Sequence, residues 1–166
     1  MFLRELTLAD CEELASVLCD PLSMVYYPAP FTLRQVEDWI DWNIENYQKY
    51  HHGLWAVILK ESNTFLGDCG ITIQDIDDEL LPELGYHIKK DYCGNGYATE
   101  AAGACIEYAF STLGYQSLFT YTKHDNSPSR RVAEKIGMTF VRTFEKTVQG
   151  TTVREALYQK NREELP

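Results

Sequence analysis

The sequence lacks the cysteine pattern of a disulfide-stabilised or zinc-binding protein. Its five cysteines are odd in number and include no CxxC pair. A secreted disulfide framework pairs its cysteines, and structural zinc sites draw on closely spaced ones. The pattern therefore favours reduced thiols in the cytoplasm, and we expect no metal site.

Long apolar runs are missing as well. The longest, Leu54 to Leu59, is far shorter than the roughly 20 residues that a membrane-spanning helix needs. The opening residues, MFLRELTLADCEEL, carry acidic side chains where a secretory signal has a sustained apolar core. We therefore expect no membrane partner and no export, and cytoplasmic is the predicted location.

Positive charge is scarce, because 15 Lys and Arg residues face 25 Asp and Glu residues and leave a net charge of −10. Binding to a phosphate backbone depends on clustered Lys and Arg, so we expect no nucleic-acid partner. Acidic residues gather between Asp75 and Glu83 without a basic neighbour. This stretch is either a solvated loop or a source of negative potential that attracts a cationic substrate.

The chain has 166 residues, and we expect a single domain over residues 1–166. Hydrophobic periodicity predicts helices at 10–18, 33–50, from the glycines at 94 and 96 to 113, and at 127–137. It predicts strands at 2–8, 54–60, 65–73, 84–89, 118–122, 139–148 and 152–159. The predicted fold class is α+β: a mixed, mostly antiparallel twisted sheet of about seven strands, flanked by four helices, with one parallel step.

Two glycines open the most regular helical pattern, DYCGNGYATEAAGACIEYAF at residues 91–110. Gly94 and Gly96 would let the backbone approach a ligand closely, and the start of a helix offers unpaired N–H groups to an anion. The alternative is a tight strand-to-helix turn. A P-loop is excluded because no GxxxxGK[ST] occurs, and Lys123 and His124 stand where a dinucleotide fold needs an acidic residue.

A second helix pattern, SPSRRVAEKIG, follows with Ser127 as its expected cap and Pro128 in its first turn. Together, ELGYHIKKDYCGNGYATEAAGACIEYAF and DNSPSRRVAEKIGM resemble the acetyl-coenzyme A core of the GNAT superfamily of N-acetyltransferases, in the branch related to ribosomal-protein N-terminal (alanine) acetyltransferases. The resemblance is close from Pro82 to Phe140, and the order of elements extends it to the whole chain. It implies an acetyl-CoA-dependent N-acetyltransferase with a GNAT fold.

The resemblance also implies roles for individual residues. Backbone amides of Gly94, Asn95, Gly96, Tyr97, Ala98 and Thr99 would hold the pyrophosphate of acetyl-CoA. The strand residues Tyr86, His87 and Ile88 would bond its pantetheine arm, Asn126 would contact the same arm, and Ser129 would lie near the sulfur. Arg130 and Arg131, in a locally basic segment, are candidates for the coenzyme phosphates or for ion pairs on the surface.

Three positions depart from the family pattern. Cys93 stands where Gln or Arg is general, and Asn95 where a basic residue is common, so less side-chain charge would reach the pyrophosphate. Ala133 stands where many relatives carry a tyrosine that acts as an acid. Ser129 or a water molecule would then have to protonate the leaving thiolate.

Acyl transfer to an amine needs a neutral amine and an acceptor for its proton. Glu83 is the first candidate for that base, with a surface carboxylate at a strand end as the alternative. Three histidines rank below it: His51 and His52, because adjacent histidines after a helix are expected to be exposed, and His124, because it follows a strand beside the coenzyme arm. In the family, the segment holding Tyr26, Tyr27 and Phe31 lines the acceptor pocket; these aromatic residues could equally seal the core.

The leading hypothesis is direct transfer of an acetyl group from acetyl-CoA, bound as a co-substrate in a ternary complex, to a small amine or a protein N-terminus. The enzyme would act as a monomer or homodimer. One alternative is an acyl-CoA-binding regulatory domain without turnover. Another, a nucleotide-binding module, depends on the glycine pair alone.

Overall fold

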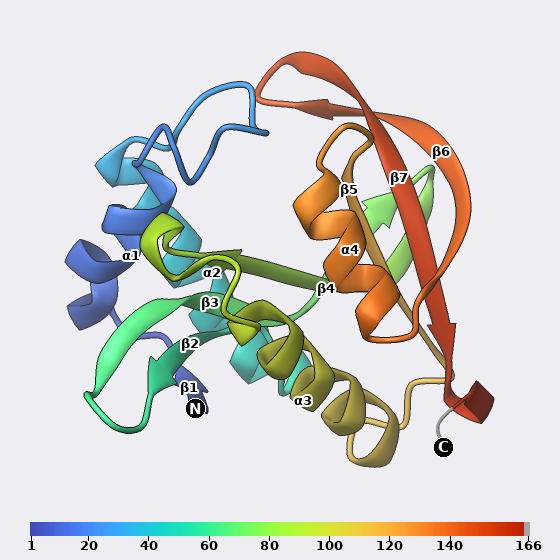
Figure 1. Ribbon diagram of the computed structural model, residues 1–166, viewed down its shortest axis with the longest axis horizontal. Helices are drawn as coiled ribbons and strands as arrows, with labels where there is room; N and C mark the ends of the chain where they lie inside the picture. The colour runs from blue at the N-terminus through green and yellow to red at the C-terminus, as the bar shows by residue number, and fades with distance from the viewer. Residues whose placement is uncertain (165–166) are drawn as a thin grey trace.

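The computed structural model describes residues 1–164 and holds one sheet of 7 strands in the order β1-β2-β3-β4-β5-β7-β6 (Figure 1). The strands are β1 (Phe2–Glu5), β2 (Leu54–Leu59), β3 (Thr64–Ile76), β4 (Glu79–Ile88), β5 (Ser117–Lys123), β6 (Thr139–Val148) and β7 (Thr151–Asn161). Every neighbouring pair is antiparallel except β4 and β5. The predicted mixed sheet with one parallel step is confirmed.

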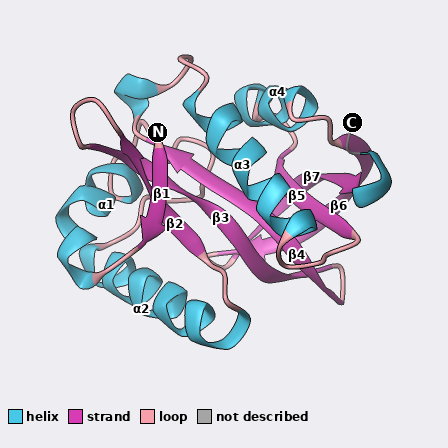
Figure 2. Cartoon of the chain, turned by 90° about the horizontal axis from the view of Figure 1, so that it is seen from below, coloured by secondary structure: helices cyan, strands magenta, loops and turns pink. Residues whose placement is uncertain are grey.

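The helices are α1 (Cys11–Leu18), α2 (Leu33–Tyr50), α3 (Tyr97–Ser111) and α4 (Ser127–Lys135). They cover both faces of the sheet (Figure 2). On one face, α1 and α2 bury Leu14, Val36 and Ile40 against Ala56 of β2. On the other, α3 buries its apolar stripe against β3 and β4, and Ala133 of α4 joins the same core. The four predicted helices are thus confirmed.

Local signals explain where several elements begin and end. Thr32 caps α2, because its hydroxyl accepts a hydrogen bond from the backbone of Gln35 at 3.3 Å. The β6–β7 turn falls at Gln149 and Gly150, both with positive φ, as the hairpin signal predicted. The expected cap of α4 is wrong by one residue: Asn126, and not Ser127, holds the N-cap position.

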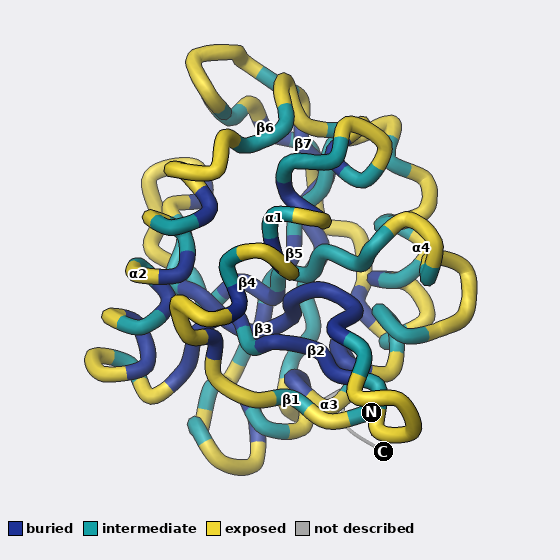
Figure 3. The backbone as a smooth tube through the Cα atoms, turned by 90° about the vertical axis from the view of Figure 1, so that its left-hand side faces the viewer, coloured by how far each residue is buried: buried dark blue, intermediate teal, exposed yellow. Residues whose placement is uncertain are grey.

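The acidic stretch after residue 74 differs from the expected solvated loop. Strand β3 continues to Ile76 and β4 begins at Glu79, so only Asp77 and Asp78 form the turn, both with positive φ. Glu83 lies well inside β4. The burial colouring shows β2 and β3 as the most continuously buried strands, because helices cover them on both faces (Figure 3).

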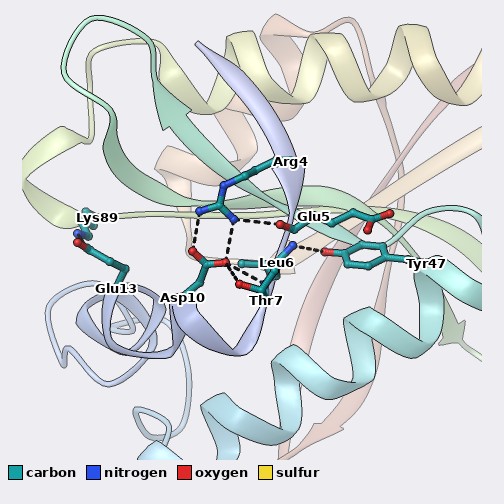
Figure 4. Close-up of polar contacts among 8 residues, drawn as sticks. All are labelled: Arg4, Glu5, Leu6, Thr7, Asp10, Glu13, Tyr47 and Lys89. Atoms are coloured by element: carbon teal, nitrogen blue, oxygen red, sulfur yellow. Dashed lines mark hydrogen bonds and ion pairs between the residues drawn. The ribbon is translucent and has the colours of Figure 1, made fainter.

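A polar network ties the N-terminal segment to the sheet (Figure 4). Arg4 of β1 donates two hydrogen bonds to the Asp10 carboxylate, at 2.8 and 2.6 Å. Asp10 also accepts from the backbone N–H of Thr7 at 2.8 Å, and Tyr47 of α2 accepts from the N–H of Leu6 at 3.0 Å. The network holds the turn between β1 and α1 in place. Helix α1 leads in turn into the loop that forms one wall of the site described below.

No helix within residues 1–164 is both long enough and apolar enough to span a membrane.

Replacing Asp10 by Ala should lower the free energy of unfolding by about 2 kcal/mol at pH 7, because the Arg4 guanidinium and the Thr7 N–H lose a charged partner. Hydrogen bonding to Arg4 lowers the pKa of Asp10 below its ordinary value. Its stabilising effect is therefore complete at neutral pH and is lost as the pH falls through that lowered pKa. Urea unfolding at pH 7 and pH 3 measures both effects.

The matched control is Asp38→Ala, which removes an exposed ion pair between Asp38 and Arg34 on α2. Such pairs contribute well under ~1 kcal/mol. Equal losses in the two variants would contradict a structural role for the Arg4–Asp10 pair.

Candidate active site

Strands β4 and β5 pair only at one point, in the middle of β4 and near the start of β5. Within residues 1–164 the register joins Glu83 to Phe119, and no later pair follows. The Thr120 hydroxyl donates to the carbonyl of Leu84 at 2.7 Å and holds the two strands together at that point. Beyond it β4 runs on to Ile88 and β5 to Lys123, so the backbone groups that β4 turns toward β5 have no strand opposite them. This gap is the centre of the site.

A cavity of about 670 Å³ lies over the gap. Its walls come from the loop between α1 and α2, from β4, from the first turns of α3 and α4, and from the β6–β7 hairpin. The hairpin meets the loop where the amide oxygen of Gln149 accepts a hydrogen bond from the N–H of Ala29 at 3.1 Å. These two segments, far apart in sequence, enclose one end of the cavity (Figure 1).

Most of the residues that sequence reasoning selected lie in this cavity. The lining includes Tyr26, Tyr27, Phe31, Glu83, Tyr86, His87, Ile88, Gly94, Gly96, Tyr97, Ala98, Thr99, Asn126, Ser129 and Arg131. Asn95 and Arg130 lie outside the lining. Asn95 folds back to donate to the carbonyl of Tyr92 at 3.1 Å. Arg130 donates to the Tyr158 hydroxyl at 2.8 Å and to the carbonyl of His124 at 3.2 Å.

The glycine loop presents backbone to open space. Gly94 and Gly96 have φ of 84° and 87°, in the left-handed region, and a Cβ added to either would meet no atom within 4 Å. Gly96 caps α3, whose first N–H groups have no acceptor within the helix and carry the positive end of its dipole. The loop therefore fits an anionic group of considerable size, such as a pyrophosphate.

The first turn of α4 brings a hydroxyl pair to the same gap. Asn126 accepts a hydrogen bond from the Ser129 N–H at 3.2 Å, and the resulting turn directs Ser129 toward β4. The Tyr86 hydroxyl lies 3.0 Å from both Oγ and the carbonyl oxygen of Ser129. Burial raises the pKa of Tyr86, so it keeps its proton at neutral pH. The Tyr86 side chain was not foreseen as part of the chemistry.

On the opposite face of β4, His87 joins a chain of polar side chains. Its Nδ1 lies 2.7 Å from the carboxylate of Asp68, which is fully buried, and its Nε2 lies 2.7 Å from the Tyr27 hydroxyl. The indole N–H of Trp39 donates to the other Asp68 oxygen at 3.1 Å. Burial alone would lower the pKa of His87, but Tyr27 and Asp68 outweigh it and raise this pKa well above the ordinary value.

Asp68 escaped sequence reasoning because nothing in the local sequence TFLGDCG marks it as a partner of His87. The signal is the strand register, which places Asp68 directly opposite His87. An acidic residue within an otherwise buried strand pattern was the available hint, since an unpaired charge is rarely buried.

Glu83 is 8% exposed and lies in mid-strand, so the alternative of a surface carboxylate at a strand end is wrong. The Thr72 hydroxyl is 3.5 Å from its Oε2. Burial raises the pKa of Glu83 to about 8. Gly85 separates Glu83 from His87 on the same face of β4, and a side chain there would approach the Glu83 carboxylate.

His52 was expected to be exposed, and that expectation is wrong. Its ring nitrogens contact the carbonyl of Ile71 at 2.7 Å and the Tyr115 hydroxyl at 2.8 Å, and only 1% of the residue is accessible. This histidine joins the end of α2 to the segment after α3. His51 ends α2 with a positive φ and is exposed. Neither lines the cavity.

Known proteins resemble this chain in sequence and in fold. The profile of the Acetyltransferase (GNAT) domain matches residues 1–139. The uncharacterized protein YkkB of Bacillus subtilis (strain 168) is 39% identical over 127 residues, which are 76% of this chain and 74% of YkkB. A GNAT-family acetyltransferase from Bacillus anthracis has a crystal structure that covers 98% of this chain and 95% of its own, with a TM-score of 0.81 and 27% identity.

The fold also matches RimL, a ribosomal L7/L12 α-N-protein acetyltransferase solved in complex with coenzyme A. That match has a TM-score of 0.77 and 15% identity, and covers 96% of this chain and 92% of RimL.

Replacing Asp68 by Asn should lower the pKa of His87 by at least about one unit, because burial then acts on the imidazole without the opposing carboxylate. NMR titration of ring-labelled histidine measures the shift. Asp38→Asn, on the exposed face of α2, is the control and should leave the His87 titration unchanged. An unaltered pKa in Asp68→Asn would contradict the proposed chain of contacts.

Proposed function

The chain belongs to the GNAT acetyltransferase family, and we propose that it acetylates a primary amine by direct attack on acetyl-CoA within a ternary complex. The acceptor would be a small amine or the α-amine of a peptide. The proposal depends above all on one observation about the gap beside β4. A glycine-led helix N-terminus lies along one side of this gap, and a buried carboxylate, Glu83, lies on the other face of β4. An anionic coenzyme and a cationic amine would therefore approach β4 from different sides.

Residues of the gap would hold acetyl-CoA, which supplies an acetyl group activated as a thioester. The N–H groups from Gly94 to Thr99 would bind its pyrophosphate, and the unpaired edge of β4 from Tyr86 to Ile88 would bind its pantetheine arm. Arg131 lines the cavity and is the better candidate for a phosphate contact, since Arg130 already bonds Tyr158. Backbone N–H groups of β4 would stabilise negative charge that develops on the acetyl oxygen.

Glu83 would accept the proton of the amine, directly or through water. An aliphatic amine with a pKa of ~10.4 costs about 4.6 kcal/mol to deprotonate at pH 7, and an α-amine near 8 costs about 1 kcal/mol. With a pKa of about 8, Glu83 is a much stronger base than an ordinary glutamate. His87 is the weaker candidate, because the raised pKa keeps it protonated and its Nδ1 is held by Asp68.

The leaving thiolate would take its proton from Ser129. The tyrosine that many relatives carry is replaced by Ala133, which is buried in the core. Tyr86 contacts Ser129 Oγ and keeps its own proton, so it can pass a proton to Ser129 or position that hydroxyl. The two hydroxyls would thus assume the role of the missing side chain.

An acceptor screen tests the function directly. Release of free thiol from acetyl-CoA is expected with members of a panel of primary amines and N-terminal peptides. Saturable coenzyme binding with no acceptor turned over across the panel would instead favour a regulatory acyl-CoA-binding domain.

Gly96→Asp should weaken acetyl-CoA binding by roughly tenfold or more, because a carboxylate would meet the pyrophosphate at the helix end. Gly96→Asn is the matched variant: it has the same size, tolerates the left-handed conformation and adds no charge. Isothermal titration calorimetry compares the two, and Gly103→Asp, in the middle of α3, controls for added charge on the helix. Equal affinities in the Asp and Asn variants would contradict the pyrophosphate assignment.

Glu83→Gln should reduce kcat/KM by about 10²-fold or more. In the parent, kcat/KM should rise with pH up to about 8, because Glu83 must lose its proton before it can act as a base. The variant should lose this part of the profile and keep only the ionisation of the amine. Glu79→Gln, exposed on the same strand, is the control. Unchanged activity and pH profile in Glu83→Gln would exclude Glu83 as the base.

A further inference from the structure

We propose that Glu155 forms a cation-binding subsite in the acceptor part of the cavity, and that it receives the second ammonium group of an elongated diamine. This proposal depends on the proposed function, because it assigns the class of amine that the enzyme acetylates. The reacting amine would lie at Glu83 and the distant ammonium at Glu155. The two carboxylates come from β4 and β7, on either side of β5.

Glu155 is a buried carboxylate, one oxygen of which is unpaired within residues 1–164. It is 5% exposed, and within the described part of the chain its Oε2 has no hydrogen-bond donor. It nevertheless lines the cavity. A buried charge without a partner costs several kcal/mol, so proteins normally pair such groups. Burial accordingly raises the pKa of Glu155 to about 7. A ligand ammonium would supply the missing partner.

The lysines near Glu155, Lys146 and Lys123, line the same cavity but contact other groups. Lys146 donates to the carbonyl of Asp75 at 2.7 Å and lies over the Tyr121 ring, 4.9 Å from its centroid. Lys123 is 3.7 Å from the carboxylate of Asp125. Among residues 1–164 no ion pair joins either lysine to Glu155. Their charge lowers the cost of an ionised Glu155 without occupying its oxygen.

The strand registers set the spacing of the two carboxylates. Glu83 lies opposite Phe119 of β5, and Glu155 lies opposite Lys123, four residues further along. At about 3.3 Å per residue this is roughly 13 Å between backbone positions along the strand. The side chains are near enough for the charge of Glu155 to raise the pKa of Glu83. Tyr121, between Phe119 and Lys123 on β5, lines the cavity as well and offers apolar surface to a hydrocarbon chain between the two charges. An ammonium at each end of a flexible methylene chain matches this arrangement.

The test compares amines of equal length that differ in the second charge. The parent enzyme is offered octamethylenediamine and octylamine, then pentamethylenediamine and pentylamine. We expect kcat/KM to be roughly tenfold or more higher for octamethylenediamine than for octylamine, with a smaller ratio for the shorter pair, which spans less of the distance. An ω-amino acid of the octyl length, with a carboxylate at the far end, should be a poorer acceptor than octylamine.

Glu155→Gln should reduce the ratio for the octyl pair to near one. The matched control is Glu145→Gln, which removes a carboxylate from the exposed side of the neighbouring strand β6 and should retain the parent ratio. Calorimetric titration of octamethylenediamine into protein saturated with coenzyme A gives a second measurement, in which Kd should rise about tenfold in Glu155→Gln.

The outcomes separate the two proposals. Turnover of octylamine and octamethylenediamine at equal kcat/KM by the parent would overturn the Glu155 subsite and leave amine acetylation intact. A parent ratio that survives in Glu155→Gln would also overturn it. Failure of every amine to release thiol would count against the proposed function, and the binding titration would then decide on the subsite alone. If Glu155→Gln does not fold, the substrate comparison in the parent remains decisive.

Discussion

Strands β4 and β5 separate immediately after Glu83 and Phe119, and every other part of the site follows from this separation. The two strands are parallel, so the helices that follow them, α3 and α4, both begin at the same end of the sheet. Thr120 bonds the carbonyl of Leu84 at the last point where the strands are close. Past it, the edge of β4 has no strand opposite it within residues 1–164, so its backbone groups can bond a ligand. The first turns of α3 and α4 add further N–H groups that the helices themselves leave unpaired.

Side-chain alternation along β4 divides the chemistry between two faces. Leu84 and Tyr86 point toward α3 and α4, where Leu84 joins the core and Tyr86 contacts Ser129. Glu83 and His87 point to the other face, where Glu83 contacts Thr72 of β3 and His87 contacts Tyr27 in the loop before α2. In the proposed reaction, the proton taken from the amine and the proton given to the thiolate would therefore be handled on opposite sides of one strand. A shift of register by one residue would exchange the two sets.

The secondary structure could be predicted from sequence because helical and strand periodicity are local. The apolar stripe of α3 and the glycines before it needed no partner to be visible. The mate of His87 could not be found in this way, because Asp68 precedes it by 19 residues and meets it only through the β3–β4 register. Glu155 was missed for the same reason: as one acid in an alternating strand it looks exposed, and only the fold of β7 against β5 buries it.

Competition between side chains explains the smaller differences between prediction and structure. Asn126 takes the cap position that Ser127 was expected to hold, and Arg130 bonds Tyr158 in place of a coenzyme phosphate.

Four carboxylates are buried within residues 1–164 of a chain that carries a net charge of −10: Asp10, which is paired with Arg4, and Asp68, Glu83 and Glu155 around the site. The three around the site differ in how they are accommodated. Asp68 is stabilised by the His87 imidazolium and the Trp39 indole N–H, and Glu83 keeps its proton up to about pH 8. Glu155 receives no hydrogen bond at its Oε2 within residues 1–164, although the charges of Lys146 and Lys123 favour its ionised form. Burying an unsatisfied acid lowers stability, so a cation that binds there recovers part of this loss and stabilises the folded state by linkage. The acidic balance of the protein acts in the same direction, because it raises the local concentration of cationic amines around the cavity. The excess of acid that argues against a nucleic-acid partner thus favours the amine acceptor that the proposed chemistry requires.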